Sequence, residues 1–158
     1  MLITMFTDAS HCSKTKIAAY AIWAKVNGGT IRHSSLFRAP LPDSTMAETM
    51  ALVNGIHVVI AKLSPPPRSR ILAQTDCLSA IALLAGPIRR GRTREKYAEI
   101  VQRYETAVAA GELSVEFRHV GGHEGFRSPR NSVNTWCDRE CRALLRRARR
   151  EVTHNTEG

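Results

Sequence analysis

Apolar residues along the chain fall into short runs typical of strands and longer, periodic stretches typical of helices. Residues 2–7 form a nearly continuous apolar run, which predicts a strand buried on both faces. Residues 17–26 and 31–37 flank Asn27-Gly28, a dipeptide that favours a tight turn between antiparallel strands. Two further strands are predicted at residues 70–75 and 113–120.

The longer stretches predict four helices. Expected ranges are 45–63, before three prolines, 77–85, before Gly86-Pro87, about 94–110, before Gly111, and about 129–150, opened by Ser128-Pro129. Strands and helices in this order predict an α/β fold with a mixed five-stranded sheet and helices on both faces. We expect one catalytic domain over residues 1–150, followed by a polar, disordered tail at 151–158.

Four acidic residues stand where a carboxylate is costly. Asp8 ends the first apolar run, Asp76 ends the fourth strand, Glu48 opens an apolar helix and Asp138 lies inside another. Ionised carboxylates in a core need a compensating partner, and a divalent metal ion would serve all four.

Each acid also has a simpler explanation. Asp8 could cap a turn, and Asp76 could be the N-cap of the helix that begins at Cys77. Glu48 stands three residues after Thr45, which is the spacing of a capping box. Asp138 could occupy a partly exposed edge of its helix. The metal-site hypothesis depends on all four occurring together.

The chain is strongly basic. It has a formal net charge of +9, and its 23 basic residues are 18 Arg and 5 Lys. Arginine suits bidentate contacts with phosphate, so a polyanionic partner is expected, although a basic surface without a partner remains open.

The four cysteines contain no CxxC pair, and the chain shows no apolar signal segment at its start. We therefore expect reduced thiols and a cytoplasmic protein. Cys137 and Cys141 are four residues apart, a spacing that fits a helical core stripe and, less well, a metal site. No run approaches the roughly 20 apolar residues of a membrane span, so no membrane contact is expected.

Several motifs together resemble the ribonuclease H family. They are FTDAS at 6–10, AETMAL at 47–52, QTDCLSAI at 74–81, HVGGHEG at 119–125 and NTWCDRECRALLRRA at 134–148. The resemblance covers about residues 1–150, and the predicted order of strands and helices is that of the ribonuclease H-like fold. It implies an endonuclease that hydrolyses the RNA strand of RNA·DNA hybrids with two Mg²⁺ ions, or with Mn²⁺.

The resemblance also assigns residues. Asp8, Glu48, Asp76 and Asp138 would be catalytic metal ligands, and His123 would assist proton transfer or product release from a flexible loop. Oxygen donors suit Mg²⁺, and paired ions suit phosphodiester hydrolysis, so the chemistry agrees.

Contacts with the nucleic acid backbone are assigned more loosely. The candidates are Ser10, Ser44, Thr45, Arg89, Arg90, Arg92, Arg94 and Asn134. Ser44 and Thr45 could equally be helix caps, and the arginine cluster could be a solvated loop. The segment after FTDAS lacks the family's usual Gly and Pro, and Cys77-Leu78 replaces a polar pair, which affects substrate preference more than catalysis.

Two alternatives remain. A DNA nuclease of the same fold, such as a junction resolvase or exonuclease, would keep the metal site, whereas a non-catalytic nucleic-acid-binding module would be expected to lack an acid. A monomer is expected.

Overall fold

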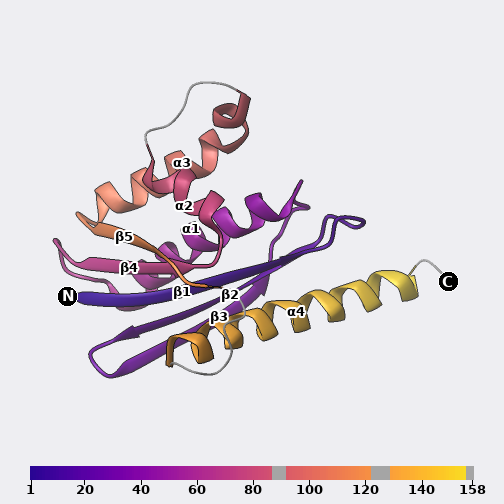
Figure 1. The fold of residues 1–158 in the computed structure, drawn as a ribbon, viewed down its shortest axis with the longest axis horizontal. Coiled ribbons are helices and arrows are strands. Elements are labelled where there is room, and N and C mark those ends of the chain that lie inside the picture. The colour runs from indigo at the N-terminus through magenta and orange to yellow at the C-terminus, as the bar shows by residue number, and fades with distance from the viewer. Residues whose placement is uncertain (87–91, 122–128, 156–158) are drawn as a thin grey trace.

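The computed structural model describes residues 1–86, 92–121 and 129–155, and the predicted strands and helices all form there (Figure 1). In chain order they are β1 (Leu2–His11), β2 (Ala18–Val26), β3 (Gly29–Leu36), α1 (Ser44–Leu63), β4 (Arg70–Thr75), α2 (Leu78–Ala85), α3 (Arg92–Ala110), β5 (Ser114–His119) and α4 (Pro129–Asn155). The side chains of residues 92–94, 129–131 and 152–155 are not described.

The five strands form one mixed sheet in the order β3-β2-β1-β4-β5. The β1–β2 and β2–β3 pairs are antiparallel, and the β1–β4 and β4–β5 pairs are parallel. The β2–β3 turn is the predicted hairpin: Val26 pairs with Gly29, and Asn27 and Gly28 take positive φ angles of 45° and 81°. The predicted fold class is confirmed.

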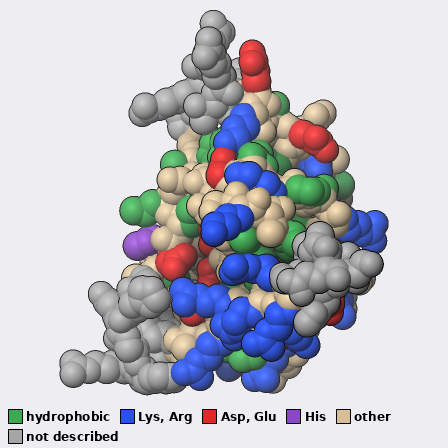
Figure 2. Space-filling view, turned by 90° about the vertical axis from the view of Figure 1, so that its right-hand side faces the viewer, with side chains coloured by type: hydrophobic (Ala, Val, Ile, Leu, Met, Phe, Trp, Pro, Cys, Tyr) green, Lys and Arg blue, Asp and Glu red, His purple; other side chains and the backbone are tan. Residues whose placement is uncertain are grey.

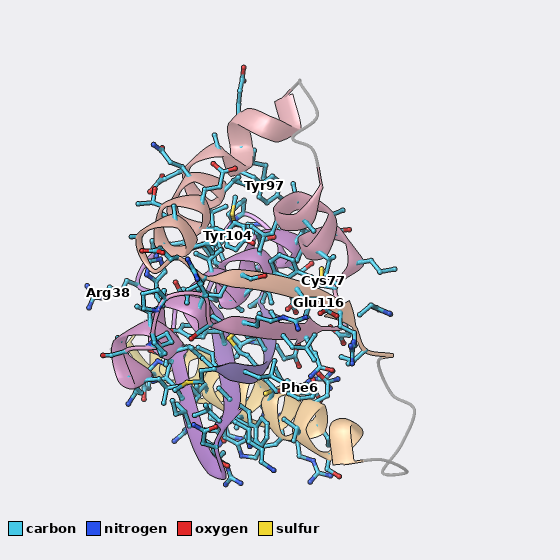
Figure 3. The ribbon with its side chains drawn as sticks, turned by 90° about the vertical axis from the view of Figure 1, so that its left-hand side faces the viewer. Phe6, Arg38, Cys77, Tyr97, Tyr104 and Glu116 are labelled. Atoms are coloured by element: carbon cyan, nitrogen blue, oxygen red, sulfur yellow. The ribbon has the colours of Figure 1, made fainter. Side chains whose placement is uncertain are left out.

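Helices cover both faces of the sheet. Helices α1, α2 and α3 lie on one face, and α4 crosses the other face under β1, β2 and β3 (Figure 1). Alternate residues of β1 enter the two cores: Ile3 and Met5 pack with α1, and Phe6 packs with Cys137 and Cys141 of α4. Figure 3 shows Tyr97 and Tyr104 on the α3 side of the sheet and Phe6 on the α4 side. Strand β1 is therefore buried on both faces, as predicted.

Strand β1 is longer than predicted. The sequence places its end at Asp8, but the strand continues to His11 because β2 pairs with it as far as the His11–Ala18 pair. Its parallel partner β4 ends at Thr75, and the β1–β4 register runs up to the Phe6–Gln74 pair. Asp8 thus lies within a strand, at the point where one neighbouring strand has ended.

Helix α4 also runs past its predicted end. It continues beyond Arg150 to Asn155, so residues 151–155 are helical and not part of a disordered tail. Residues 156–158 of the predicted tail lie outside the described residues.

Helix α1 corrects the expectation about membrane spans. It is 20 residues long, with a mean hydropathy of 1.3 in its most apolar window, so its length and composition alone would allow it to cross a membrane. In the structure its side chains Leu52, Val53 and Ile56 are fully buried in the core with β1. Its apolar character is explained by this packing.

All four cysteines are free thiols. Cys137 and Cys141 are fully buried beside Phe6, and burial raises the pKa of both thiols strongly. Metal binding requires a thiolate, which a raised pKa disfavours. The prediction that this pair packs in the core is confirmed.

Candidate metal centre

Two of the predicted acids lie on neighbouring segments of the sheet: Asp8 is within β1, and Asp76 directly follows β4. Phe6 of β1 lies opposite Gln74 of β4 in a parallel register. Side chains two residues apart along a strand point to the same face. Asp8 and Asp76 each stand two residues after this pair, so the register brings them side by side at the carboxyl end of β4.

The third acid, Glu48, reaches the site from α1. Gly55 lies seven residues later, on the same side of the helix, and a Cβ atom there would be 2.8 Å from Met5 Sδ and 3.0 Å from Thr7 Cγ2. Glycine therefore allows α1 to lie close against β1. Glu48 Oε1 is 3.2 Å from the main-chain nitrogen of Ala9, which donates a hydrogen bond to it.

The capping alternatives for Glu48 and Asp76 are wrong. Asp43 is the N-cap of α1, and its Oδ1 accepts a hydrogen bond from the Met46 amide at 2.8 Å, so Glu48 is not part of a capping box with Thr45. Helix α2 has Cys77 at its N-cap, without a side-chain capping bond. The carboxylate of Asp76 is therefore not used as a cap.

Asp8, Glu48 and Asp76 converge. Each offers one carboxylate oxygen, and these oxygens all lie within 4.8 Å of one another. Burial, followed by the charges of Asp76 and Asp138, raises the pKa of Asp8 to about 7. Burial, followed by the charges of Asp8 and Asp76, raises the pKa of Glu48 to about 9. Three ionised carboxylates this close repel one another, and a bound cation would offset the repulsion.

One oxygen of this cluster is buried without a hydrogen-bond partner. Among the described residues, the buried side-chain oxygens without a hydrogen-bond partner belong to Thr7, Glu48, Gln74 and Asn134. Each is one of the acids or lies within four residues of one. The Oε2 atom of Glu48 matters most, because it is a buried carboxylate oxygen inside the cluster and lacks a donor. The donor set, carboxylate oxygens with one free of competing hydrogen bonds, fits a hard divalent cation such as Mg²⁺ or Mn²⁺.

Asp138 is near this cluster but not part of it. It projects from α4, and its negative charge contributes to the raised pKa of Asp8. Its Oδ1 atom is 2.6 Å from Nε of Arg142, one helical turn along. The prediction that four acids converge is therefore confirmed for three, while the fourth is paired with an arginine.

His119 is a site neighbour that the sequence analysis did not single out. It ends β5, where it pairs with Thr75, and its Nε2 atom lies 3.1 Å from the main-chain oxygen of Asp76. A carbonyl oxygen accepts only, so Nε2 is the donor. One sequence feature could have identified His119: it stands at the carboxyl end of a predicted strand, and the strand before it in the sequence is followed directly by Asp76.

Of the predicted substrate-contact residues, two lie close along the chain to the site acids, two begin α1, and the side chains of the others, like that of His123, are not described. Ser10 follows Asp8 by two residues on β1, and Asn134 precedes Asp138 by one helical turn on α4. Ser44 and Thr45 begin α1, where the Met46 amide is already bonded to Asp43, which also pairs with Lys96. Arg89, Arg90 and His123 lie outside the described residues, as do the side chains of Arg92 and Arg94 in the first turn of α3.

No protein-family model matches the sequence, and a comparison with curated protein sequences also finds no match. Solved structures do match. RNase H1 from the halophilic archaeon Halobacterium salinarum NRC-1 has a TM-score of 0.68 at 14% identity, covering 92% of this chain and 98% of that one. The N-terminal RNase H domain of a Mycobacterium tuberculosis protein, solved as a fusion with maltose-binding protein, has a TM-score of 0.68 at 12% identity, covering 96% and 98%.

A third match is LC11-RNase H1 in complex with an RNA/DNA hybrid, with a TM-score of 0.63 at 14% identity, covering 92% of this chain and 98% of that one. All three matches extend over nearly the whole of both chains. The chain therefore has the ribonuclease H fold. At these identities the likeness establishes the fold and not the chemistry of the site.

Proposed function

We propose that this protein is a metal-dependent ribonuclease H that hydrolyses the RNA strand of RNA·DNA hybrids. The observation that carries the proposal is the convergence of Asp8, Glu48 and Asp76, with oxygens within 4.8 Å of one another, in a chain with the ribonuclease H fold. Three carboxylates brought together from two strands and a helix have no structural need for one another. They suit a site for divalent ions.

Asp8, Glu48 and Asp76 would hold the metal, and Asp138 would join them by exchanging Arg142 for a cation. Two bound Mg²⁺ ions would supply an activated water and stabilise the leaving oxygen of the scissile phosphate. The chain's own part is to fix these oxygens. Ala9 donates to Asp8 Oδ1 as well as to Glu48 Oε1, and His119 holds the main chain at Asp76.

His123 is proposed as the residue that assists proton transfer or product release. Ser10 and Asn134 would contact the substrate beside the acids, with Ser44, Thr45, Arg89, Arg90, Arg92 and Arg94 contributing contacts with the backbone. The solved neighbour that holds an RNA/DNA hybrid supports this class of substrate. The net charge of +9 supports a polyanionic partner of any kind.

A panel of labelled substrates tests the proposal. RNA·DNA hybrid, duplex RNA, duplex DNA and single strands would each be incubated with Mg²⁺, Mn²⁺ or EDTA. We expect cleavage of the RNA strand of the hybrid with either metal and none with EDTA, because the 2′-hydroxyl and the shape of the hybrid distinguish it. Faster cleavage of duplex DNA would instead indicate a DNA nuclease of this fold, and no cleavage of any substrate would indicate a binding module.

Two further properties are proposed, the compartment and the oligomeric state. Four free thiols favour a reducing compartment such as the cytoplasm. A monomer is proposed because the site draws its acids from a single chain, and size-exclusion chromatography with light scattering would test it.

A further inference from the structure

A row of arginines leads away from the metal centre along α4. Arg142 and Arg146 follow Asp138 in steps of four residues, and Arg149 and Arg150 stand three and four residues after Arg146, so all four arginines lie on one flank of the helix. All four arginines are exposed, whereas the stripe next to them, which includes Cys141 and Leu145, is buried. At about 1.5 Å per residue, the row extends about 18 Å from Asp138 to Arg150.

The turn between β1 and β2 continues this surface. Lys14 and Lys16 are both exposed there, but Nζ of Lys16 donates a hydrogen bond to the main-chain oxygen of Pro42, in the segment before α1, so only Lys14 is taken as part of this surface. Cys12, at the start of this turn, packs in the same core cluster as Cys141 and Leu145 of α4, so the turn lies against the helix. Figure 2 shows Lys and Arg side chains gathered over the lower part of this end of the molecule, where α4 lies. We call Lys14, Arg142, Arg146, Arg149 and Arg150 the α4 basic patch.

The opposite flank of α4 is different. Glu140 faces β3, where its Oε1 accepts a hydrogen bond from Ser34 Oγ at 3.0 Å. Arg147 and Glu151 follow Glu140 on this flank at helical spacing. Positive charge is thus concentrated on the flank that Asp138 shares.

We propose that the α4 basic patch binds the phosphate backbone of a nucleic acid duplex beyond the cleavage site. This inference rests on the proposed function, because it names where a duplex held at the metal centre would continue. Arginine binds phosphate oxygens through a planar fork and reads no sequence in doing so. At about 3.4 Å per base pair, the 18 Å row would follow roughly five base pairs.

The test compares two variants that each lose two positive charges. Arg146→Gln/Arg150→Gln removes two members of the row without touching Asp138 or Arg142. Lys25→Gln/Lys62→Gln is the matched control, because neither lysine belongs to the α4 basic patch. Lys25 of β2 pairs with Thr4 near the start of β1, away from the end that carries Asp8, and Lys62 is in the last turn of α1. All four side chains are exposed, and a thermal melt would verify that both variants fold.

Binding would be measured in EDTA by fluorescence anisotropy over a range of salt concentrations, with hybrids of about 8 and about 24 base pairs. The association constant K falls as salt rises, and each phosphate contact contributes about 0.9 to the steepness of log K against log salt. On the long duplex, the loss of two contacts in the row variant should therefore make this slope shallower by about 1.8. On the short duplex the change should be smaller. The control should change the slope by much less. Equal changes in the two variants would overturn the proposal, as would a row variant that loses binding to phosphatidylserine vesicles and not to duplex.

This experiment is independent of catalysis. Binding through the row by a protein that cuts no hybrid would contradict the proposed function and leave the α4 basic patch standing. Cleavage of hybrid, together with an unchanged salt slope in the row variant, would support the proposed function and overturn the role of the α4 basic patch.

Discussion

The main-chain nitrogen of Ala9 lies 3.2 Å from Oε1 of Glu48. The same amide lies 2.9 Å from Oδ1 of Asp8, so one donor holds a helix carboxylate and a strand carboxylate side by side. Two buried carboxylates that share one donor lie close enough to disfavour each other's ionised form. Without metal, the cluster therefore retains protons at a pH at which a solvated acid would lose them.

This arrangement predicts a stability that falls with pH in the absence of metal. The pKa rises from 3.8 to about 7 for Asp8 and from 4.5 to about 9 for Glu48, mainly through burial. The folded state then binds more protons than the unfolded state between these values, so the contribution of the two acids is full below about pH 4 and lost as pH rises towards 9. Thermal melts in EDTA at stepped pH would measure it.

Glu48→Gln is the control for this pH effect. Glutamine resembles the protonated acid that the metal-free cluster favours, so the variant should be as stable as wild type near pH 5 and more stable near pH 9. A wild type and a Glu48→Gln variant whose melting temperatures run parallel over this range would contradict the raised pKa values.

Arg142 is predicted to compete with metal for Asp138. Nε of Arg142 lies 2.6 Å from Oδ1 of Asp138. The guanidinium would repel an incoming divalent ion, and it also occupies the carboxylate oxygen that the ion would bind. Arg142→Gln should therefore bind Mg²⁺ several-fold more tightly by isothermal titration, while binding hybrid more weakly. Arg147→Gln removes the same charge from the other flank of α4 and should leave Mg²⁺ affinity nearly unchanged. Weaker Mg²⁺ binding in Arg142→Gln would refute the competition.

His119 is predicted to position Asp76 through its main chain. A hydrogen bond of this kind contributes about 0.5 to 1.5 kcal/mol, or about 2- to 12-fold. His119→Leu should weaken Mg²⁺ binding and lower kcat within that range, whereas His119→Gln, whose amide nitrogen can donate in the same place, should recover most of both. If the two variants behave alike, the hydrogen bond has no positioning role.

The proposed division of roles in catalysis predicts a graded loss of activity. A histidine that transfers protons typically contributes 10² to 10⁴-fold, whereas loss of a metal ligand removes the nucleophile and the leaving-group stabilisation together. His123→Ala should retain weak Mg²⁺-dependent cleavage, and Asp8→Asn should fall to background. Equal and complete loss in the two variants would show that His123 does more than transfer protons.

The fold was predictable from local patterns, and the three site acids from their occurrence together in a sequence that resembles the ribonuclease H family. Apolar runs, Asn27-Gly28 and the prolines after Ser64 mark where strands and helices begin and end, and an acid at the end of a buried strand marks the edge where parallel strands finish. The extension of β1 to His11 was not predictable, because it depends on pairing with β2.

Side-chain partners were also beyond local patterns. The ion pair between Asp138 and Arg142 competes with metal coordination, and spacing alone does not decide between them. The contact of His119 with Asp76 depends on the register between β4 and β5. The capping explanation for Glu48 was wrong because the N-cap of the helix is Asp43, two residues before Thr45.

The most direct test of the metal centre is the melting temperature of wild type and Asp76→Asn with and without Mg²⁺ at neutral pH. If Asp8, Glu48 and Asp76 converge on a cation, Mg²⁺ at a hundredfold excess over its dissociation constant should stabilise wild type by about 2.7 kcal/mol. Asp76→Asn should be at least as stable as wild type without metal, because it relieves repulsion, and should lose most of the response to Mg²⁺. A wild type that does not respond to Mg²⁺ or Mn²⁺, together with a destabilised Asp76→Asn, would contradict the account.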